Sequence, residues 1–570
     1  MNKRIYLVPG TILLMVLFSL TSTAQDLLKG SEVHGSMQMD AAYYLKDTKM
    51  GITDSTLGGQ LIRMNAFTEV NYSFENFSAG LRFETYLPPL TGYDAKYNGS
   101  GIPYWYANYK NSFIDVTAGN FYEQFGNGMI LRTYQEWTLG VDNSLQGIRV
   151  KLMPAKGITI KGVYGTQRYY WEPFKDYNRG IVKGLDGDVN LNELITGMAN
   201  ARVKLILGGS VASNYQQGNT KTITYDGKLL ALNMPENVAN YGGRFNMNIG
   251  GFNWQTEIAH KINDPSARNN YIYKDGNGLF TNVSWSQKGL GIQVMSKWID
   301  NMSYKSDRSV VNNMLDINYL PAITKQHTYA LASMYPYATQ PDGEVGISGT
   351  ITIHLPKNSP LGGKTGLSIA ANFSQVNGLK QTALNDSTAI GQTGTLGYKT
   401  TVYGFGNKLY YQDGNVEVSK KFNSKWKGIF TYLHQAYNKD VVEGHVNQYG
   451  IIYSHIGVAD IAWSITKKLN LRWEVQGLWT KQDKGNWVAG LAEVTISPAW
   501  FFSVMDQYNF GNDVPSQRLN YYLVSAGYTN HTSRVAISWG RQREGIICVG
   551  GVCRYVPATN GVTLTITSSF

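Results

Sequence analysis

Apolar and polar residues alternate along most of this 570-residue chain. In residues 62–72, one set of alternate positions holds Ile62, Met64, Ala66, Val70 and Tyr72, and the other holds Arg63, Asn65, Glu69 and Asn71. Residues 79–87 repeat the pattern after a short turn at 75–77. A period of two is the pattern of a β-strand with one apolar and one polar face. The chain therefore predicts strands of about 9–12 residues and little helix.

The connections between these strands alternate between short and long. Short turns fall near 76, 111 and 250, and long connections fall at 121–144, 304–344 and 376–407, among others. This alternation is typical of a transmembrane barrel with short periplasmic turns and long extracellular loops. It predicts an all-β fold, a single large antiparallel β-barrel of about 24 strands. The range is about 22–26, because residues 325–338 can add a pair of strands or form a loop hairpin. The alternative fold is a series of β-sandwich domains, as in an adhesin.

The last ten residues, 561–570, give a second indication of a barrel. Val562, Leu564 and Ile566 alternate with threonines, and the chain ends on Phe570. This segment resembles the carboxy-terminal insertion signal of Gram-negative outer-membrane β-barrels. The resemblance implies a location in the bacterial outer membrane, contact with its lipids, and recognition of Phe570 by the barrel-assembly machinery. The alternative is the last edge strand of a soluble sandwich.

The amino-terminal segment predicts secretion. Lys3 and Arg4 precede an apolar run at 12–20, and small residues at 22–24 complete the pattern of a secretory signal peptide. The run is too short to span a membrane. We therefore expect a signal peptide at 1–24 and an outer-membrane barrel at 25–570. Residues 25–32 are too few for the plug domain of TonB-dependent transporters, and no repeat of assembly-core type precedes the first strand.

Composition supports the barrel and narrows the function. The chain holds 39 Tyr and 13 Trp, and only 16% of its residues are charged, as expected if aromatic girdles mark two membrane interfaces. The formal net charge is +11, but the basic residues are dispersed, so no nucleic-acid partner is expected. No Ser/His/acid spacing of the kind used by barrel hydrolases occurs, so we expect neither an enzyme nor a cofactor.

The segment from Cys548 to Cys553 is the sharpest local motif. Gly550 and Gly551 suit a two-residue hairpin turn, which places Cys548 opposite Cys553 at a separation that allows a disulfide. The cell envelope is oxidising, so we predict this disulfide in an extracellular hairpin. A metal pair is disfavoured because no His or acid flanks the motif. The Gly-Gly-Val-Cys-Arg-Tyr-Val-Pro segment is similar to a feature of a large, poorly characterised barrel family, which implies no function.

The loop that follows residue 119 is similar, through residue 149, to a region of alginate-export and substrate-specific porins. The shared pattern is Gly119 to Gly128, and the chain departs from it at Asn120. The resemblance implies an inward-folded loop that narrows the pore, with a constriction lined by Tyr122, Glu123, Arg132 and Glu136. The alternative is an ordinary loop packed by Phe121, Phe125 and Trp137.

Charged residues at the polar strand positions are expected to line the lumen. They are Arg63, Glu69, Arg82, Glu84, Arg149, Lys151, Lys161, Arg472, Glu474 and Glu493. They can form an electrostatic filter or a mixed-sign ladder across the strands. The run that begins Asp186-Gly-Asp188 resembles the start of a calcium loop, but Leu191 and Gly197 stand where glycine and glutamate are needed. We therefore predict no metal site.

Two functions fit these observations. The first is a porin-like channel for polar solutes, with sugars suggested by the aromatic- and Asn-rich loops. The second is a structural or interaction barrel, a subunit of a secretion, assembly or surface-lipoprotein complex, whose lumen is blocked by its loops.

Overall fold

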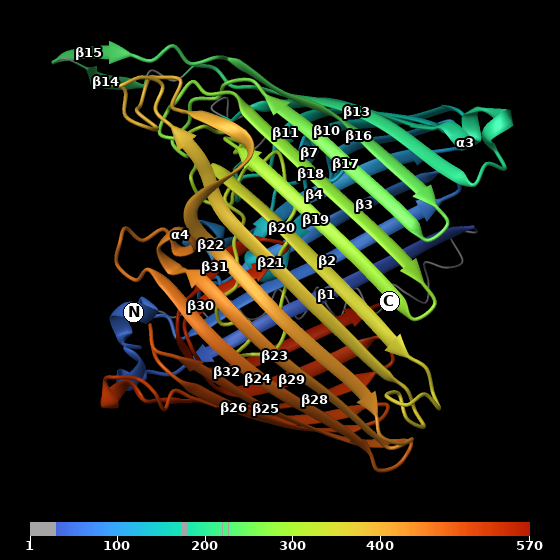
Figure 1. The fold of residues 1–570 in the computed structure, drawn as a ribbon, viewed down its shortest axis with the longest axis vertical. Coiled ribbons are helices and arrows are strands. Elements are labelled where there is room, and N and C mark those ends of the chain that lie inside the picture. Colours follow the sequence, from blue (N-terminus) through green and yellow to red (C-terminus); the bar gives the residue numbers. More distant parts are fainter. Residues whose placement is uncertain (1–29, 173–178, 219–220, 226) are drawn as a thin grey trace, which may run out of the picture.

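The structure, a computed structural model, describes residues 30–172, 179–218, 221–225 and 227–570. The predicted signal peptide at 1–24 lies outside these residues. The described chain forms a closed antiparallel barrel of 24 strands (Figure 1). This confirms the predicted fold and strand number. None of the described helices is long and apolar enough to cross a membrane.

The barrel strands follow one another around the wall in chain order. They are β1 (Ser31–Tyr44), β2 (Ile62–Phe74), β3 (Phe77–Tyr86), β4 (Gly99–Lys110), β5 (Ile114–Phe121), β10 (Leu145–Ala155), β11 (Ile158–Gln167), β12 (Ile181–Asn190), β13 (Val203–Tyr215), β16 (Asn237–Ile249), β17 (Phe252–Lys261), β18 (Gly276–Gln287), β19 (Leu290–Asp300), β20 (Gly343–Leu355), β21 (Leu367–Thr382), β22 (Lys399–Lys421), β23 (Trp426–Asn438), β24 (Ile451–Ser464), β25 (Leu469–Thr480), β26 (Trp487–Ile496), β27 (Trp500–Tyr508), β28 (Asn520–Asn530), β29 (Ser533–Gln542) and β32 (Thr559–Ser569).

The smaller elements lie in the connections. Two-stranded pairs are β6 (Gln124–Phe125) with β7 (Leu131–Arg132), β8 (Gln135–Glu136) with β9 (Val141–Asp142), β14 (Thr222–Tyr225) with β15 (Lys228–Ala231), and β30 (Gly545–Val549) with β31 (Val552–Val556). The helices are η1 (Thr48–Met50), α2 (Asp54–Leu57), η2 (Ala95–Tyr97), η3 (Trp137–Leu139), α3 (Leu191–Leu194), η4 (Thr196–Met198), α4 (Lys439–Glu443) and η5 (Pro515–Gln517).

The two ends of the barrel differ. Connections such as β2–β3, β16–β17 and β28–β29 are short and lie at one end, called here the short-turn rim (Figure 1). The connections β5–β10 and β19–β20 are long and belong to the other end, the long-loop rim. Residues 325–338 form no strand and lie within the long β19–β20 connection, so they do not add a pair of strands to the barrel.

The outward and inward faces follow the predicted register. Ile62, Ile148, Ile351 and Val475 point outward, with exposed fractions of 66%, 45%, 44% and 59%. The adjacent inward residue Glu474 is buried. An outward band of exposed apolar side chains around the whole wall would be unfavourable in water and is suited to a hydrocarbon layer.

One part of the outward face is covered by the chain itself. Alternation places Val345 on the outward face, yet its side chain is fully buried with Trp298 and Leu379. The long strand β22 extends past the rim, and the Tyr403 hydroxyl lies 2.9 Å from Ser296 Oγ. The wall is therefore two layers thick at this position, so Val345 faces protein and not lipid.

The barrel closes between its first and last strands. β1 pairs with β32, with Asp40 opposite Thr565. Beyond β32, the Phe570 N–H donates to the Gly35 carbonyl at 2.9 Å, and Phe570 O accepts from Gly35 N at 2.8 Å. A Cβ on Gly35 would lie 2.2 Å from the Phe570 ring. The absence of a side chain at Gly35 therefore allows the ring to lie against β1.

Deletion of Phe570 should weaken this closure. The variant loses two backbone hydrogen bonds, each worth roughly 0.5–1.5 kcal/mol, together with the ring contact. We expect a lower folded fraction in lipid vesicles, measured by heat-modifiable gel mobility, while the control Ser568→Ala should fold normally. Wild-type mobility and yield of the deletion variant would contradict this role.

Candidate functional site

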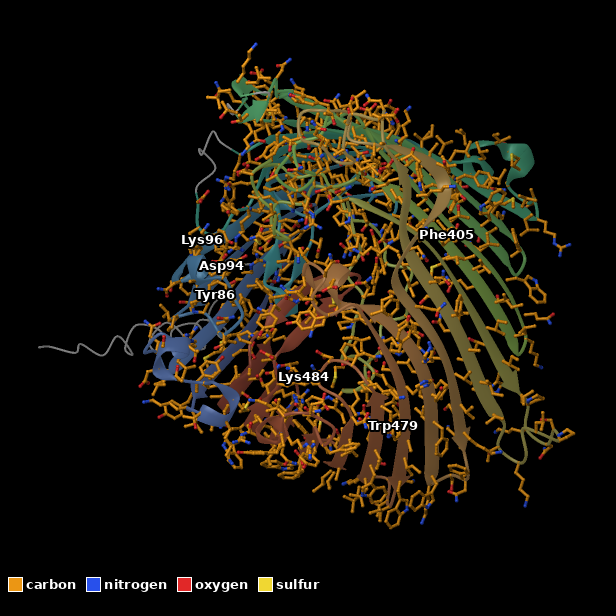
Figure 2. The ribbon with its side chains drawn as sticks, turned by 60° about the vertical axis from the view of Figure 1, so that its left-hand side comes forward. Tyr86, Asp94, Lys96, Phe405, Trp479 and Lys484 are labelled. Atoms are coloured by element: carbon orange, nitrogen blue, oxygen red, sulfur yellow. A yellow bond between two sulfur atoms is a disulfide. The ribbon has the colours of Figure 1, made fainter. Side chains whose placement is uncertain are left out.

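Two long connections fold into the barrel and occupy the part of the lumen nearer the long-loop rim. They are residues 122–144, between β5 and β10, and residues 301–342, between β19 and β20. Together they are called here the loop plug. Side chains gather in the interior of the barrel as well as on its outer wall (Figure 2). Because both segments connect strands of the barrel, the plug is built from loops of the barrel itself.

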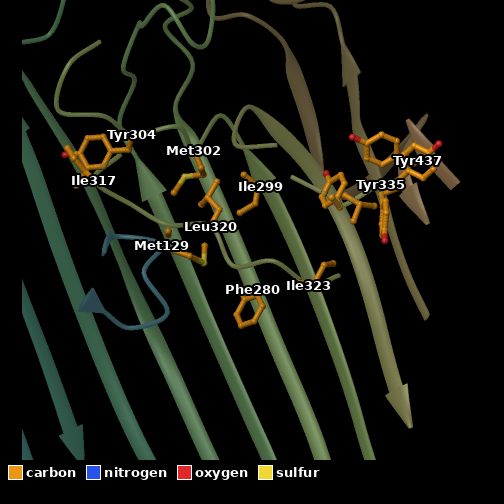
Figure 3. Close-up of a cluster of buried hydrophobic side chains, with 14 of the residues drawn as sticks. Met129, Phe280, Ile299, Met302, Tyr304, Ile317, Leu320, Ile323, Tyr335 and Tyr437 are labelled. Carbon is orange, nitrogen blue, oxygen red and sulfur yellow. The ribbon is translucent and has the colours of Figure 1, made fainter. Parts of the chain in front are cut away.

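The loop plug has an apolar core. Met129 of the first loop and Ile317 and Leu320 of the second pack with Phe280 and Ile299 of the wall (Figure 3). Met129, Ile299 and Ile317 have no measurable exposure. Burial of a side chain of this size contributes about 1.5–3 kcal/mol. The core thus holds both loops against the strands β18 and β19.

Hydrogen bonds join the two loops and satisfy their buried backbone. Arg132 N donates to Ile317 O at 2.8 Å, and Tyr319 N donates to Gly128 O at 2.9 Å. The wall contributes Asn240, whose Nδ2 donates to Met129 O at 2.9 Å. Buried peptide groups need such partners to remain away from water. The plug therefore has a defined path and is not a collapsed coil.

A buried cluster of four charges fixes the first loop to the wall. Arg82 and Glu84 come from β3, Asp142 from the loop, and Arg168 from the residue after β11. Arg168 binds Glu84 and Asp142, each at 2.7 Å, and Arg82 binds Glu84 at 2.7 Å and also Asp142. Burial alone would raise the pKa of Asp142, but the guanidinium groups of Arg168 and Arg82 lower it below its ordinary value. The four buried side chains thus carry two positive and two negative charges, and Glu69, the third carboxylate near Arg82, is partly exposed.

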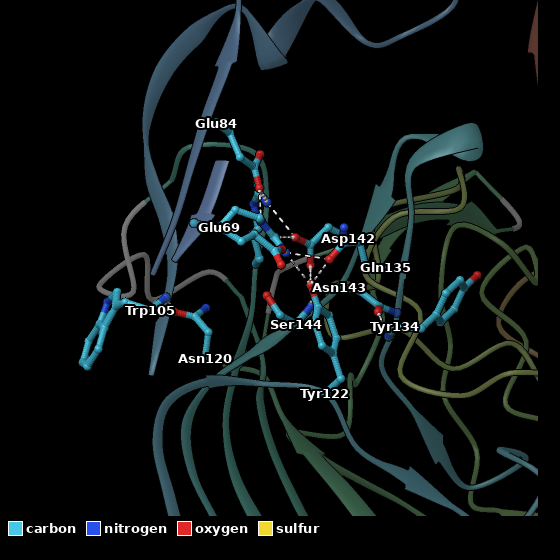
Figure 4. Close-up of polar contacts among 12 residues, drawn as sticks. Glu69, Glu84, Trp105, Asn120, Tyr122, Tyr134, Gln135, Asp142, Asn143 and Ser144 are labelled. Atoms are coloured by element: carbon cyan, nitrogen blue, oxygen red, sulfur yellow. Dashed lines mark hydrogen bonds and ion pairs between the residues drawn. The ribbon is translucent and has the colours of Figure 1, made fainter. Parts of the chain in front are cut away.

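A small pocket lies beside this cluster. Tyr122 donates to Asp142 Oδ1 at 3.0 Å, and Arg82 donates to Gln135 Oε1 at 2.6 Å (Figure 4). The Tyr122 ring stacks on Tyr104 with a centroid distance of 5.4 Å. The pocket measures about 220 Å³ and is lined by Glu69, Asn71, Leu81, Arg82, Tyr104, Tyr106, Tyr122 and Gln135. It is called here the tyrosine pocket.

The four residues predicted for a constriction do not meet at one point. Tyr122 belongs to the tyrosine pocket, and Glu123 binds Lys161 of the wall at 3.0 Å. The Arg132 guanidinium lies 4.0 Å from the centre of the Tyr319 ring. Glu136 accepts from Thr138 N at 2.9 Å within its own loop. The loop folds inward as the porin resemblance implies, and Phe125 packs it as in the alternative interpretation.

Most of the predicted lumen charges have partners of opposite sign. Arg149 binds Asp115 at 2.6 Å, Arg82 lies 3.4 Å from Glu69, and Arg472 binds Asp460 at 3.0 Å and also Glu474. Such mixed pairs favour a ladder over a filter of one sign. The exceptions differ among themselves. Arg63 donates to the carbonyls of Leu57 and Pro89, and Lys151 and Glu493 form no ion pair with any described residue.

The middle of the second loop reaches strands β22, β24 and β25, further round the wall, which sequence reasoning missed. His327 lies 2.5 Å from Asp413 of β22, and Leu331 N donates to Gln476 of β25 at 2.8 Å. The Tyr329 hydroxyl donates to Asp460 of β24 at 3.2 Å. The signal available in the sequence was the density of Tyr, Met and Leu in 301–342, because a loop in water rarely needs so many.

The cysteine hairpin covers the plug. Cys548 and Cys553 form the predicted disulfide, and Gly550 and Gly551 have φ values of +59° and +85° in the turn. Contacts with the second loop include Gln326 Nε2 donating to Cys548 O at 2.8 Å and Thr339 N donating to Gly551 O at 2.9 Å. The disulfide therefore staples a hairpin in the last long connection, as predicted, and this hairpin lies over the plug.

Removal of the disulfide should loosen this hairpin and leave the barrel intact. For Cys548→Ser/Cys553→Ser we expect a loss of about 2 kcal/mol of local stability, the value for such a short closed loop. Limited proteolysis within 545–556 should become faster, with unchanged heat-modifiable mobility. Equal proteolysis rates in the wild type and the variant, or two alkylatable thiols in the wild type, would contradict the prediction.

Below the plug, toward the short-turn rim, lies a polar vestibule of about 770 Å³. Its lining includes Lys161, Asp188, Arg244, Asn246 and Gln255. Arg244 binds Asp186 and Asp188, each at 2.7 Å, so the run that resembles a calcium loop is paired with a cation. No group of three or more metal-ligating side chains gathers in the described ranges.

Comparison with protein families identifies the chain. The model of a family of unknown function, DUF6029, matches residues 3–570. The chain belongs to this family. A comparison of this DUF6029 member with curated proteins finds no match.

Solved structures of other barrels resemble this DUF6029 chain at low identity. The siderophore receptor PirA from Pseudomonas aeruginosa is 9% identical, with 95% of this chain and 80% of that chain covered and a TM-score of 0.40. The translocation pore of the P pilus usher PapC is 9% identical, with 94% of this chain and 99% of that chain covered and a TM-score of 0.37. OpdQ from Pseudomonas aeruginosa is 8% identical, with 95% of this chain and 98% of that chain covered and a TM-score of 0.33. We draw no functional argument from these likenesses. The resemblance of 119–149 to alginate-export porins stays a prediction.

Proposed function

We propose that this DUF6029 barrel is a gated channel for polar solutes in the bacterial outer membrane, with its short-turn rim toward the periplasm. The observation that carries the proposal is the combination of an apolar outer wall with a polar vestibule beneath a plug made from loops. The outer wall suits lipid and the vestibule suits a hydrated solute. The plug separates the vestibule from the long-loop rim.

The way the plug is held suits a gate. The backbone joins each loop of the plug to its neighbouring strands. The other described contacts between the two loops and the barrel wall are non-covalent: an apolar core, hydrogen bonds and ion pairs. Contacts of this kind can break and re-form together when one loop has two packed arrangements. Displacement of residues 322–334 would break their bonds to β22, β24 and β25. We propose that this segment is the moving part.

The tyrosine pocket supports sugars as the solute class. Aromatic faces stack on the C–H faces of a sugar ring, while amide and carboxylate groups bind its hydroxyls. Tyr104 and Tyr122 provide stacked faces, and Asn71, Gln135 and Glu69 provide the polar groups. A volume of about 220 Å³ suits one sugar ring. The proposal is that a hydroxyl-rich solute binds here during passage.

Single-channel conductance in planar bilayers tests the gate. We expect rare, small steps from the wild type and larger, more frequent steps when residues 322–334 are replaced by a Gly-Ser linker of equal length. The same replacement at 383–395, in the β21–β22 connection outside the plug, is the control and should behave like the wild type. A silent 322–334 variant that is correctly folded would contradict the channel.

The second candidate is an interaction barrel that does not conduct. The observation in its favour is the size of the apolar core in the plug, which resembles a permanent core more than a mobile lid. In this case the barrel would serve as a subunit of an outer-membrane complex, with a surface lipoprotein as one partner. Co-purification of such a lipoprotein with a barrel that stays silent in the conductance experiment would support it.

A further inference from the structure

Three neighbouring turns at the short-turn rim carry lysines without any carboxylate. The turns join β20 to β21, β22 to β23, and β24 to β25, and no Asp or Glu occurs within 351–370, 418–429 or 461–471. Each turn presents an exposed pair of lysines: Lys357 and Lys364, Lys421 and Lys425, and Lys467 and Lys468. These six residues are called here the lysine rim. It is a cationic surface of one sign.

The turns form one continuous surface. The Thr365 hydroxyl of the first turn donates to the Lys421 carbonyl, and Ser464 N donates to Lys425 O at 2.8 Å. No residue in the described part of the chain forms an ion pair with a lysine of this rim. At the long-loop rim, in contrast, Lys439 binds Asp483 and Lys484 binds Glu544, each at 2.7 Å. The repulsion among the rim lysines therefore calls for anions from outside the protein.

The position of the lysine rim relative to a membrane follows from three tryptophans. Trp426, Trp463 and Trp473 face outward just above these turns, and their rings stack with centroid distances of 5.1 Å between the first two and 6.3 Å between the last two. Tryptophan concentrates where hydrocarbon gives way to headgroups. Leu361, at the tip of the first turn, is 73% exposed. The lysines thus lie at the level of lipid phosphates.

We infer that the lysine rim binds the headgroups of anionic phospholipids in the leaflet at the short-turn side. The positive charge of the lysines suits a phosphate partner. The height of the three tryptophans along the barrel wall places the ammonium groups at the depth of the lipid phosphates, which favours lipid over a soluble acidic protein. The inference goes beyond the proposed channel and holds whether or not the lumen conducts. It depends only on insertion of the barrel in a membrane.

Lipid retention tests the inference. The barrel is inserted in nanodiscs of phosphatidylethanolamine and phosphatidylglycerol, then released, and the retained lipids are counted by native mass spectrometry. For K421Q/K425Q/K467Q/K468Q we expect the ratio of retained phosphatidylglycerol to phosphatidylethanolamine to fall about fivefold or more. The control K49Q/K228Q/K380Q/K408Q removes the same number of exposed lysines near the long-loop rim and should retain the wild-type ratio.

Two further measurements keep the outcomes distinct. Heat-modifiable mobility confirms that each variant is inserted, so a failure of insertion is not read as a loss of lipid binding. The phosphatidylglycerol preference of the wild type should weaken between low and high salt, as expected for exposed charges. Equal ratios in the wild type and the lysine-rim variant would overturn the inference, and so would an equal fall in the control. Neither outcome would alter the conductance result.

Discussion

Replacement of Arg168 by methionine should destabilise the barrel by about 3–5 kcal/mol and release the 122–144 loop from the wall. The substitution leaves Glu84 and Asp142 buried with Arg82 as their single cation, and these three buried side chains then carry a net charge of −1. An unbalanced buried charge is costly because the interior cannot solvate it. Thermal unfolding in detergent and limited proteolysis of the loop provide the measurements.

A matched substitution separates this effect from a general loss of arginine. Arg472 also binds two carboxylates, but its side chain is 33% exposed, so Arg472→Met should cost no more than about 1 kcal/mol. The double variant Arg168→Met/Glu84→Gln restores the charge balance and should recover part of the loss. Equal stabilities of Arg168→Met and Arg472→Met would show that the buried cluster does not hold the loop.

Acid should reduce the difference between the wild type and Arg168→Met. The pKa of Asp142 is below its ordinary value in the folded protein, so its stabilising contribution is present above the unfolded pKa and is lost as pH falls through the folded pKa. In the variant, Asp142 keeps one cation and is protonated more readily. A gap between the two melting temperatures that stays constant from neutral pH to pH 3 would count against this account.

The second large effect is expected on the outer wall. Ile351→Arg places a charge on the outward face of β20, near the middle of the strand, at a cost of about 2–4 kcal/mol near the bilayer midplane. Thr350→Arg places the same side chain in the lumen and should fold normally. The folded fraction in vesicles, measured by heat-modifiable mobility, distinguishes the two.

Chemical labelling checks the same register independently. A membrane-impermeant thiol reagent should label Thr350→Cys and spare Ile351→Cys. The opposite labelling pattern would show that the face assignment of β20 is shifted by one residue, as a bulge would cause.

The sequence determines the faces of the wall more clearly than the contents of the lumen. Ile351 and Val475 point outward as the period of two predicts, because successive side chains of a strand can point only to one face of the sheet or the other. Alternation weakens toward the long-loop rim, where inward positions such as Ile456 and Leu478 are apolar as well. Apolar inward positions of this kind indicate that protein and not water fills this part of the lumen.

The partners inside the barrel were beyond the reach of pattern analysis. A period of two places Arg82 in the lumen, but its partner Asp142 lies 60 residues away on a loop with no period of its own. The path of that loop depends on contacts with the second loop, such as Tyr319 to Gly128. Local sequence encodes which way a strand residue points, whereas the pairing of distant loops is a property of the packed interior.

The pairing of β1 with β32 has a consequence for how the chain folds. Asp40 and Thr565 are 525 residues apart, yet their side chains share a hydrogen bond of 2.7 Å. Until this seam forms, the sheet has two unpaired edges, each a template for aggregation. Because contacts between such distant residues form slowly, a nearly complete but open sheet must persist during folding. Protection of those two edges, rather than the formation of hairpins between neighbouring strands, should therefore limit the yield of folded barrel.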